Sequence, residues 1–225
     1  NNWVAGGKQG FFEVDNFTSP AYVARLDYRG VPGLRIGGSF YYCVNTASNS
    51  DKVATYAGVK APLRIYTVDG QYKNKYVTAR TNFVFGNLTG ATAISNKNKG
   101  LSNSSPYTRV VQVAKKAVSY AGEVGVNLRS ICNGNKKVPV IYPFARYEYY
   151  NPQEAGEKGQ LPMDKRNQVS MWTAGLNWYA LPNLVVKADY MTRQIGTGKV
   201  FGKGKYNSEN EFSIGIAYVG WFIKK

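Results

Sequence analysis

The sequence predicts an all-β protein, namely an antiparallel β-barrel that spans a membrane. Three observations lead to this prediction. Many segments alternate between apolar and polar side chains, the connections between them alternate between short and long, and the aromatic side chains gather on the apolar side. Alternation with a period of two residues is typical of strands that have one wet face and one apolar face.

The alternation is clearest close to the end of the chain. Phe212, Ile214 and Ile216 take every second position, and Ser213 and Gly215 lie between them. No segment has the roughly 18 to 20 unbroken apolar residues that a spanning helix requires. Segments with the same period predict nine strands, near residues 20–29, 33–44, 62–73, 75–88, 118–131, 138–150, 168–180, 183–192 and 209–222.

The connections between these strands alternate in length. Short turns are expected at 30–33, 73–75, 132–137 and 180–183, and long polar stretches at 45–61, 89–117, 151–167 and 194–208. Transmembrane barrels have short periplasmic turns and long external loops. Residues 110–118 fit either a short helix in a loop or an early start of the next strand. Antiparallel closure needs an even number of strands, and residues 1–19 are a candidate for a partial tenth.

The distribution of aromatic and charged residues decides which face meets lipid. Tyrosine and tryptophan lie on the apolar face near strand ends, as interfacial girdles require, at Tyr28, Tyr42, Tyr149, Trp178 and Tyr190. The opposite face mixes full charges with glycine and serine, which suits a watery lumen. A soluble, lipocalin-like barrel would carry large apolar residues on its inner face, and this sequence mostly lacks them there.

The composition excludes several classes of function. The chain has no histidine, so zinc sites and Ser-His-Asp or Cys-His chemistry are excluded or crippled. We therefore expect no enzyme, no metal and no cofactor. The net charge is +16, from 29 Lys and Arg against 13 Asp and Glu. Such an excess is found in proteins that bind nucleic acid, lie against an anionic membrane or line a path for anions. It is also found where the charges simply form a solvated surface.

The two cysteines test the topology. In a barrel whose last strand runs towards the periplasm, Cys43 ends a strand near the outside and Cys132 lies in a periplasmic turn. A membrane of about 30 Å would separate them, whereas a disulfide needs a Cα separation of about 4.4–6.8 Å. The sequence therefore predicts two free thiols.

Four segments together resemble the C-terminal half of the phosphate-selective porin O and P family, in the form found in Bacteroidetes. They are "AYVARLDYRGVPGLRIGGSFYY", "YPFARYEYYN", "TAGLNWYALPNLVVKADY" and "NEFSIGIAYVGWF". The final alternating strand also looks like the signal that outer-membrane assembly machinery reads. The resemblance implies a Gram-negative outer-membrane porin of sixteen or eighteen strands, commonly trimeric, that admits small anions. Residues 1–225 would then be one barrel domain, the C-terminal part of a larger barrel.

The candidate site is the set of basic side chains expected to point into the lumen. They are Arg25, Arg29, Arg35, Arg80, Arg129, Arg146, Lys187 and Arg193. The acids Asp27, Asp69, Glu123, Glu148 and Asp189 are expected on the same face, so cations outnumber acids there. A positive lumen and rim would attract anions. The competing interpretation is that Arg–Asp and Arg–Glu pairs neutralise each other across neighbouring strands, above all Arg25 with Asp27 and Arg146 with Glu148.

These observations predict a passive diffusion porin that favours anions, phosphate-like ones included. Its expected partners are outer-membrane lipid, small anionic solutes, and further copies in a homotrimer or a larger membrane complex. The alternative is a non-channel barrel with a structural or docking role, which a lumen plugged by residues 89–117 would favour. A soluble basic β-protein that binds nucleic acid or polysaccharide fits less well. Such proteins place aromatic and basic side chains on one face, so no nucleic-acid partner is expected.

Overall fold

Nine antiparallel strands form one sheet in which each strand pairs with its neighbours in the chain. The computed structural model describes residues 19–47, 56–100, 112–196 and 206–218. The strands are β1 (Ala21–Tyr28), β2 (Leu34–Cys43), β3 (Leu63–Lys73), β4 (Val77–Leu88), β5 (Lys116–Val126), β6 (Val140–Ala155), β7 (Val169–Leu181), β8 (Leu184–Gly196) and β9 (Tyr206–Tyr218). The all-β prediction is confirmed.

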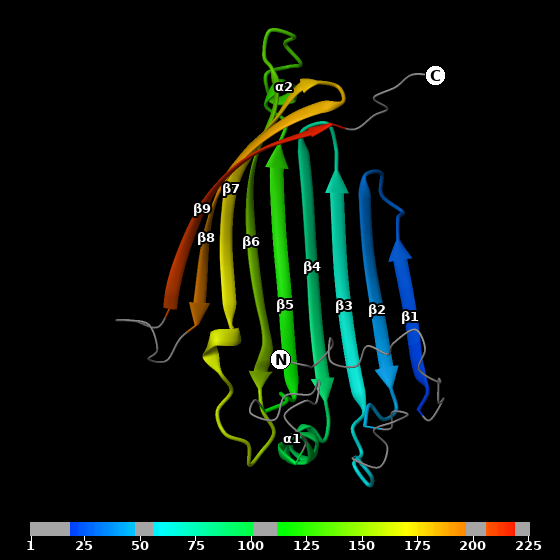
Figure 1. Cartoon of the computed structure of the whole chain (residues 1–225). Helices are drawn as coiled ribbons and strands as arrows, with labels where there is room; N and C mark the ends of the chain where they lie inside the picture. The colour runs from blue at the N-terminus through cyan, green and yellow to red at the C-terminus, as the bar shows by residue number, and fades with distance from the viewer. Residues whose placement is uncertain (1–18, 48–55, 101–111, 197–205, 219–225) are drawn as a thin grey trace, which may run out of the picture.

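The sheet is a curved wall that is open along β1 and β9 (Figure 1). Within the described residues, neither of these two strands has a partner on its outer edge. Residues 1–19, the candidate tenth strand, lie outside the described part of the chain except for Ser19, which precedes β1. In the described residues the nine strands therefore form an open sheet and not a closed barrel.

The connections lie alternately at the two ends of the sheet, and at one end three of the four are short. We call this the short-turn end, and its connections comprise residues 29–33, 74–76, 127–139 and 182–183. The short turn predicted over 132–137 is wrong, because the connection from β5 to β6 contains a helix and is as long as 156–168. Four long connections, which define the long-loop end, comprise residues 44–62, 89–115, 156–168 and 197–205. Helix α1 (Ala91–Lys99) lies at the long-loop end and α2 (Leu128–Ile131) at the short-turn end (Figure 1). A short 3₁₀ turn, η2 (Lys165–Asn167), precedes β7.

The strand predicted over 118–131 is wrong at its C-terminal end, where the structure has α2. The Asn127 backbone N–H makes the last hydrogen bond to the β4 side, to the Tyr76 carbonyl at 2.7 Å. Its side-chain oxygen then accepts from the Ser130 N–H at 3.3 Å, which is the bond that an N-cap residue makes. Its side-chain amide donates to the Tyr142 hydroxyl at 2.9 Å and holds the cap against β6.

The other differences extend strands or resolve an open alternative. Strands β6, β8 and β9 reach further into predicted loop, to Ala155, to Gly196 and from Tyr206, because ladder hydrogen bonds join backbone groups whatever the side chains are. Residues 116–118 begin β5, and 112–115 form no helix, so the early-strand alternative holds for the described part of 110–118. The helix of this connection is α1, in a stretch predicted as loop.

The hydrophobic core is small and lies at the long-loop end rather than against the sheet. Its buried members are Ala47, Tyr56, Val59, Ala61, Leu88 and Ala91. No large side chain in the described residues is completely buried. None of the helices there has the length and apolar character needed to cross a membrane.

Candidate pore-lining face

The strand register divides the side chains into two faces. Side chains that are cross-strand partners point to the same side of a sheet, and successive residues point to opposite sides. One continuous row runs through Arg35, Gln71, Arg80, Glu123 and Arg146. We call the side of the sheet that carries this row the polar face, and the opposite side the apolar face.

The apolar face carries large side chains that nothing in the described structure covers. Leu26 is 81% exposed, Ile214 is 70% exposed and Trp172 is 60% exposed. Burying such residues in an apolar phase is favourable, by about 25 cal/mol for each Å² of apolar surface. A sheet face of this size and character needs an apolar environment, and it matches the lipid-facing band of a transmembrane barrel.

Aromatic rings add to this face in pairs between neighbouring strands. The ring centroids of Tyr120 and Tyr149 are 4.9 Å apart, and those of Tyr147 and Trp172 are 4.6 Å apart. These spacings are typical of favourable aromatic pairs. These paired rings lie on the face opposite to the charged row, as the sequence predicts for Tyr149.

Ion pairs occupy the polar face along β1, β2 and β3. A terminal nitrogen of Arg25 lies 2.8 Å from Asp27 and 2.7 Å from Asp69. Arg35 contacts the same Asp69 carboxylate at 2.9 Å. Asp69 therefore joins two arginines from neighbouring strands. Gly37 lies between them, and a side chain there would collide with the Arg25–Asp27–Asp69 group.

A second group of ion pairs lies on β4, β5 and β6. Arg80 contacts Glu123 at 2.7 Å across the β4–β5 ladder. Arg146 is the ladder partner of Glu123 but forms its ion pair with Glu148 on its own strand. Neutralisation of Arg25 by Asp27 and of Arg146 by Glu148 is thus present, and Arg35 and Arg80 are paired as well.

The predicted excess of cations on the polar face is wrong for the described strands. Seven basic side chains lie there, namely Arg25, Arg35, Lys73, Arg80, Arg146, Lys187 and Arg193. Seven acidic ones accompany them, namely Asp27, Asp69, Glu123, Glu148, Asp189, Glu209 and Glu211. The predicted set omitted Glu209, Glu211 and Lys73. Counting back by twos from Ser213 in β9 would have found both glutamates.

Two predicted members of the site lie outside the strands. Arg29 follows the last residue of β1 and belongs to a short turn. Arg129 lies in α2, where its Nε donates to the Val138 carbonyl at 2.6 Å. Neither occupies the strand position from which the sequence projected it inward, because β1 ends at Tyr28 and β5 at Val126.

The other two predicted residues lie on β8. Arg193 forms a 2.9 Å ion pair with its ladder partner Glu209. Lys187 faces Asn177 and Gly215 across its two ladders, and it makes no ion pair with any acid in the described residues. Among the eight basic residues predicted to line the lumen, Lys187 alone lies on a strand without an ion pair to a described acid.

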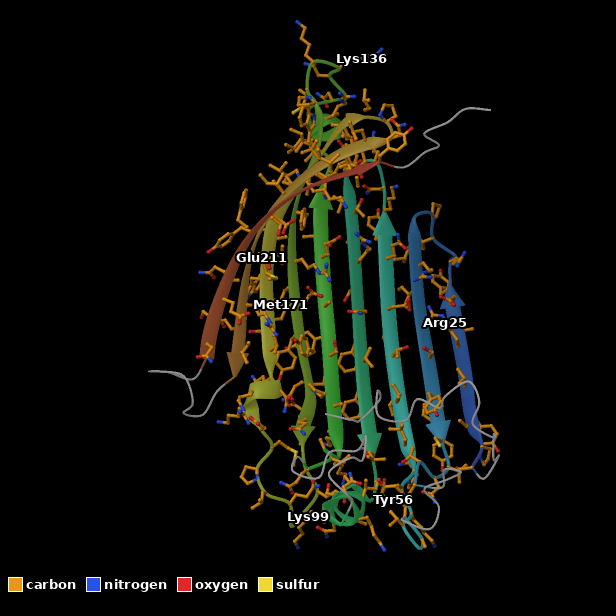
Figure 2. The ribbon with its side chains drawn as sticks, viewed as in Figure 1. Arg25, Tyr56, Lys99, Lys136, Met171 and Glu211 are labelled. Atoms are coloured by element: carbon orange, nitrogen blue, oxygen red, sulfur yellow. The ribbon has the colours of Figure 1, made fainter. Side chains whose placement is uncertain are left out.

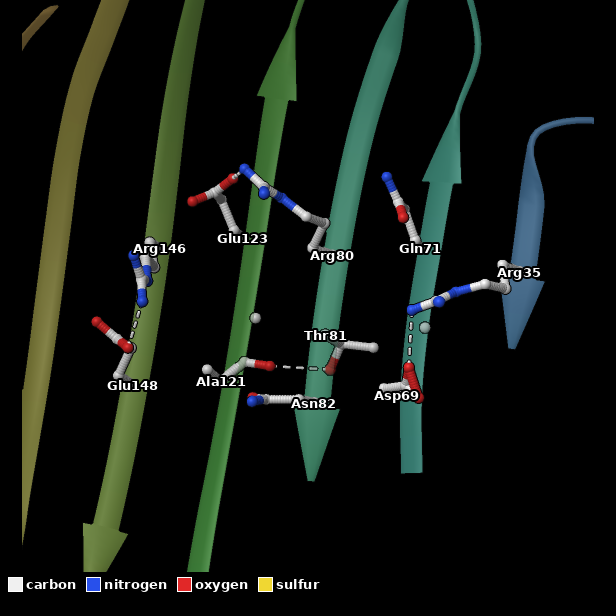
Figure 3. A pocket seen from close by; sticks show the side chains of 12 residues that line it. Arg35, Asp69, Gln71, Arg80, Thr81, Asn82, Ala121, Glu123, Arg146 and Glu148 are labelled. Carbon is white, nitrogen blue, oxygen red and sulfur yellow. Dashed lines mark hydrogen bonds and ion pairs between the residues drawn. The ribbon is translucent and has the colours of Figure 1, made fainter. Parts of the chain in front are cut away.

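The middle of the polar face contains a hollow of about 320 Å³ between the charged side chains of β2 to β6 (Figure 3). It forms where the small side chain of Ala121 leaves space beside Arg80, Glu123 and Glu148. We call it the central hollow.

At the long-loop end, α1 packs against the polar face. Leu63 and Leu88 are ladder partners on this face, and they pack with Ala91 and Ile94 of the helix. The Glu157 carboxylate holds the start of the helix. It accepts from the Gly90 and Thr92 backbone N–H groups at 2.8 and 2.9 Å. Helix α1 and Glu157 therefore cover part of the polar face at the long-loop end.

The cysteines lie at opposite ends of the sheet, and both thiols are free. Cys43 ends β2 at the long-loop end and is buried, whereas Cys132 follows α2 at the short-turn end and is exposed. The described residues contain no group of three or more His, Cys, Asp or Glu that could hold a metal ion.

A comparison with protein families decides the assignment. The family model described as phosphate-selective porin O and P matches residues 33–218. This chain belongs to the phosphate-selective porin O and P family. Comparisons with curated proteins and with solved structures gave no match. Membership of this family agrees with a sheet that has one exposed apolar face, one charged face, and short and long connections at opposite ends.

Membership of the porin O and P family implies a channel protein of the Gram-negative outer membrane. The match begins at Gly33 and ends at Tyr218, so it covers eight of the nine strands completely, β2 to β9. The strands that carry the central hollow, β2 to β6, all lie inside the matched range.

Proposed function

We propose that this chain lines a water-filled outer-membrane channel through which small solutes diffuse passively, with a preference for anions. The observation that carries the proposal is the division of one sheet into an exposed apolar face and a charged face of seven basic and seven acidic side chains. A wall of this kind separates lipid from water. The polar face would be the wall of the channel.

Because the polar face is balanced, the support for anion preference comes from the two ends. The four connections at the short-turn end contain no acid, and their basic residues are Arg29, Lys75, Arg129, Lys136 and Lys137. The described parts of the long connections contain seven basic residues, Lys60, Lys97, Lys99, Lys115, Lys158, Lys165 and Arg166, against Glu157 and Asp164. Lys136 and Lys99 mark the two ends (Figure 2). Positive mouths raise the local concentration of anions.

We also propose that the nine strands belong to a larger barrel. Strands β1 and β9 both run from the long-loop end to the short-turn end (Figure 1), so they would be parallel if they paired with each other. Antiparallel closure therefore requires an odd number of further strands. Seven or nine would complete the sixteen or eighteen that the family resemblance implies. Assembly into a homotrimer, or into a larger membrane complex, remains a prediction.

A second candidate function is a structural or docking role without transport. The packing of α1 over Leu63 and Leu88 favours it, because a helix on the polar face narrows the mouth. The two candidates differ in whether current passes.

Conductance in planar lipid bilayers tests both. We expect single-channel currents, with a reversal potential in asymmetric KCl that reports preference for chloride. A reversal potential of the opposite sign would contradict the anion preference and leave the channel standing. Absence of current from inserted protein would contradict the channel and favour the docking role.

A further inference from the structure

The central hollow joins positive and negative side chains in alternating order. Across three neighbouring strands, Arg80, Glu123 and Arg146 are successive ladder partners, so a cation, an anion and a cation lie in one row. The next row on the same face contains Asp69 and Glu148 and lies two residues along each strand, towards the long-loop end. Figure 3 shows these side chains extending over the same hollow.

Each ion pair in the hollow leaves hydrogen-bonding capacity unused. Arg80 bonds to Glu123 through Nη2 and Oε1 only, and Arg146 bonds to Glu148 through the same two atoms. A guanidinium has five N–H donors and a carboxylate has two acceptor oxygens. Free donors and free acceptors therefore lie side by side.

These side chains are accessible to a solute. The Arg80 side chain is 62% exposed and that of Glu123 is 23% exposed. Exposed ion pairs of this kind contribute little to stability, so exchanging partners with a solute costs little. A channel needs such weak binding, because a solute must leave as easily as it enters.

We propose that the central hollow recognises small zwitterionic solutes, those that carry an ammonium and a carboxylate group a few bonds apart, as α-amino acids do. The carboxylate of the solute would bind the free N–H donors of Arg80 and Arg146 in the two-pronged way that guanidinium favours. Its ammonium would bind the free oxygen of Glu123 or Glu148. A simple anion that approaches Arg80 is repelled by Glu123. A simple cation that approaches Glu123 is repelled by Arg80.

This inference rests on the proposed channel function and assigns a solute class to its wall. It also separates two roles. The positive connections at the two ends select solutes by their net charge, whereas the central hollow selects them by how the charges are arranged within one solute.

Swelling of proteoliposomes tests the inference with two isomers, alanine and lactamide. They have the same composition and nearly the same size, but only alanine is a zwitterion. With the complete protein in phosphatidylcholine vesicles, we expect alanine at low concentration to enter about threefold faster than lactamide, as a weak ion-pair interaction would give. The alanine rate should also saturate as its concentration rises, whereas the lactamide rate should stay linear.

Two charge-removing variants locate the effect. Arg80→Gln with Glu123→Gln should lower the alanine rate towards that of lactamide without changing lactamide entry, because the Arg146–Glu148 pair still remains in the hollow. Arg193→Gln with Glu209→Gln removes a cross-strand pair outside the hollow and should keep the difference.

Equal rates for the two isomers through the unmodified protein, with current still measurable, would overturn the zwitterion inference and leave the channel. Loss of the difference in both variants would overturn its assignment to the central hollow. Absence of both swelling and current would overturn the channel itself.

Discussion

The Glu157 carboxylate accepts a hydrogen bond from the Gly90 backbone N–H at 2.8 Å, and so joins two connections that lie 67 residues apart in the chain. Its second oxygen accepts from the Thr92 N–H at 2.9 Å. These donors belong to the first turn of α1, whose N–H groups have no partner within the helix. Glu157 therefore supplies the acidic group that the first turn of α1 itself lacks.

We predict that Glu157→Gln loosens α1 without disturbing the sheet. Glutamine has one acceptor oxygen instead of two and no charge to complement the helix dipole, so the loss should be about 1 kcal/mol of local stability. Hydrogen exchange at residues 91–95 should be several-fold faster. Glu154→Gln is the matched control, because Glu154 bonds to Tyr149 and Asn151 and not to the helix. Equal effects of the two changes would contradict the assignment.

The same contact predicts a dependence on pH. Burial opposes the charged form of Glu157, but hydrogen bonds from Thr92 and Gly90 outweigh it and hold the pKa of this carboxyl below its ordinary value of 4.5. A lowered pKa in the folded state means that the stabilisation is complete above pH 4.5 and is lost as the pH falls through the folded-state value. Protection of α1 should therefore decline only at acidic pH, and Glu157→Gln should remove this step.

Adjacent residues of β9 should respond in opposite ways to a new charge. Ile214 is on the apolar face and Ser213 on the polar face, beside Asp189. We predict that Ile214→Lys costs about 2–4 kcal/mol of folding free energy in a bilayer, as a charge at mid-membrane depth does. Ser213→Lys should cost little. Folding yield into lipid vesicles, followed by heat-modifiable migration on gels, measures both. A tolerated lysine at 214 would contradict the assignment of the faces.

The cysteines allow a direct test of which residues are accessible. Cys132 is exposed in the connection after α2, whereas Cys43 is buried at the end of β2. A maleimide reagent should label Cys132 rapidly in the folded protein and Cys43 only after unfolding. The variants Cys132→Ser and Cys43→Ser assign the labels. In intact cells, a reagent that cannot cross the outer membrane should label neither thiol if the short-turn end faces the periplasm.

Much of the fold could be predicted because a strand between two different environments needs apolar and polar residues in alternation, and this alternation is visible in the sequence. Phe212, Ile214 and Ile216 must meet one phase and Ser213 and Gly215 the other, so a period of two marks both the strand and its faces. Turn residues such as Pro32 and the Asn133–Gly134 pair mark the short connections. These signals are local, and one sequence is enough to detect them.

The remaining features depend on partners that are distant in sequence. The end of β5 depends on the contacts of Asn127 with Tyr76 and Tyr142, and α1 depends on Glu157, none of which has a local signature. The ion pairs of the polar face depend on register, because only strand pairing sets Glu123 beside Arg80 and Glu209 beside Arg193. Alternation along the chain shows which side a residue faces, but pairing between strands decides which charges meet, and that required the folded sheet.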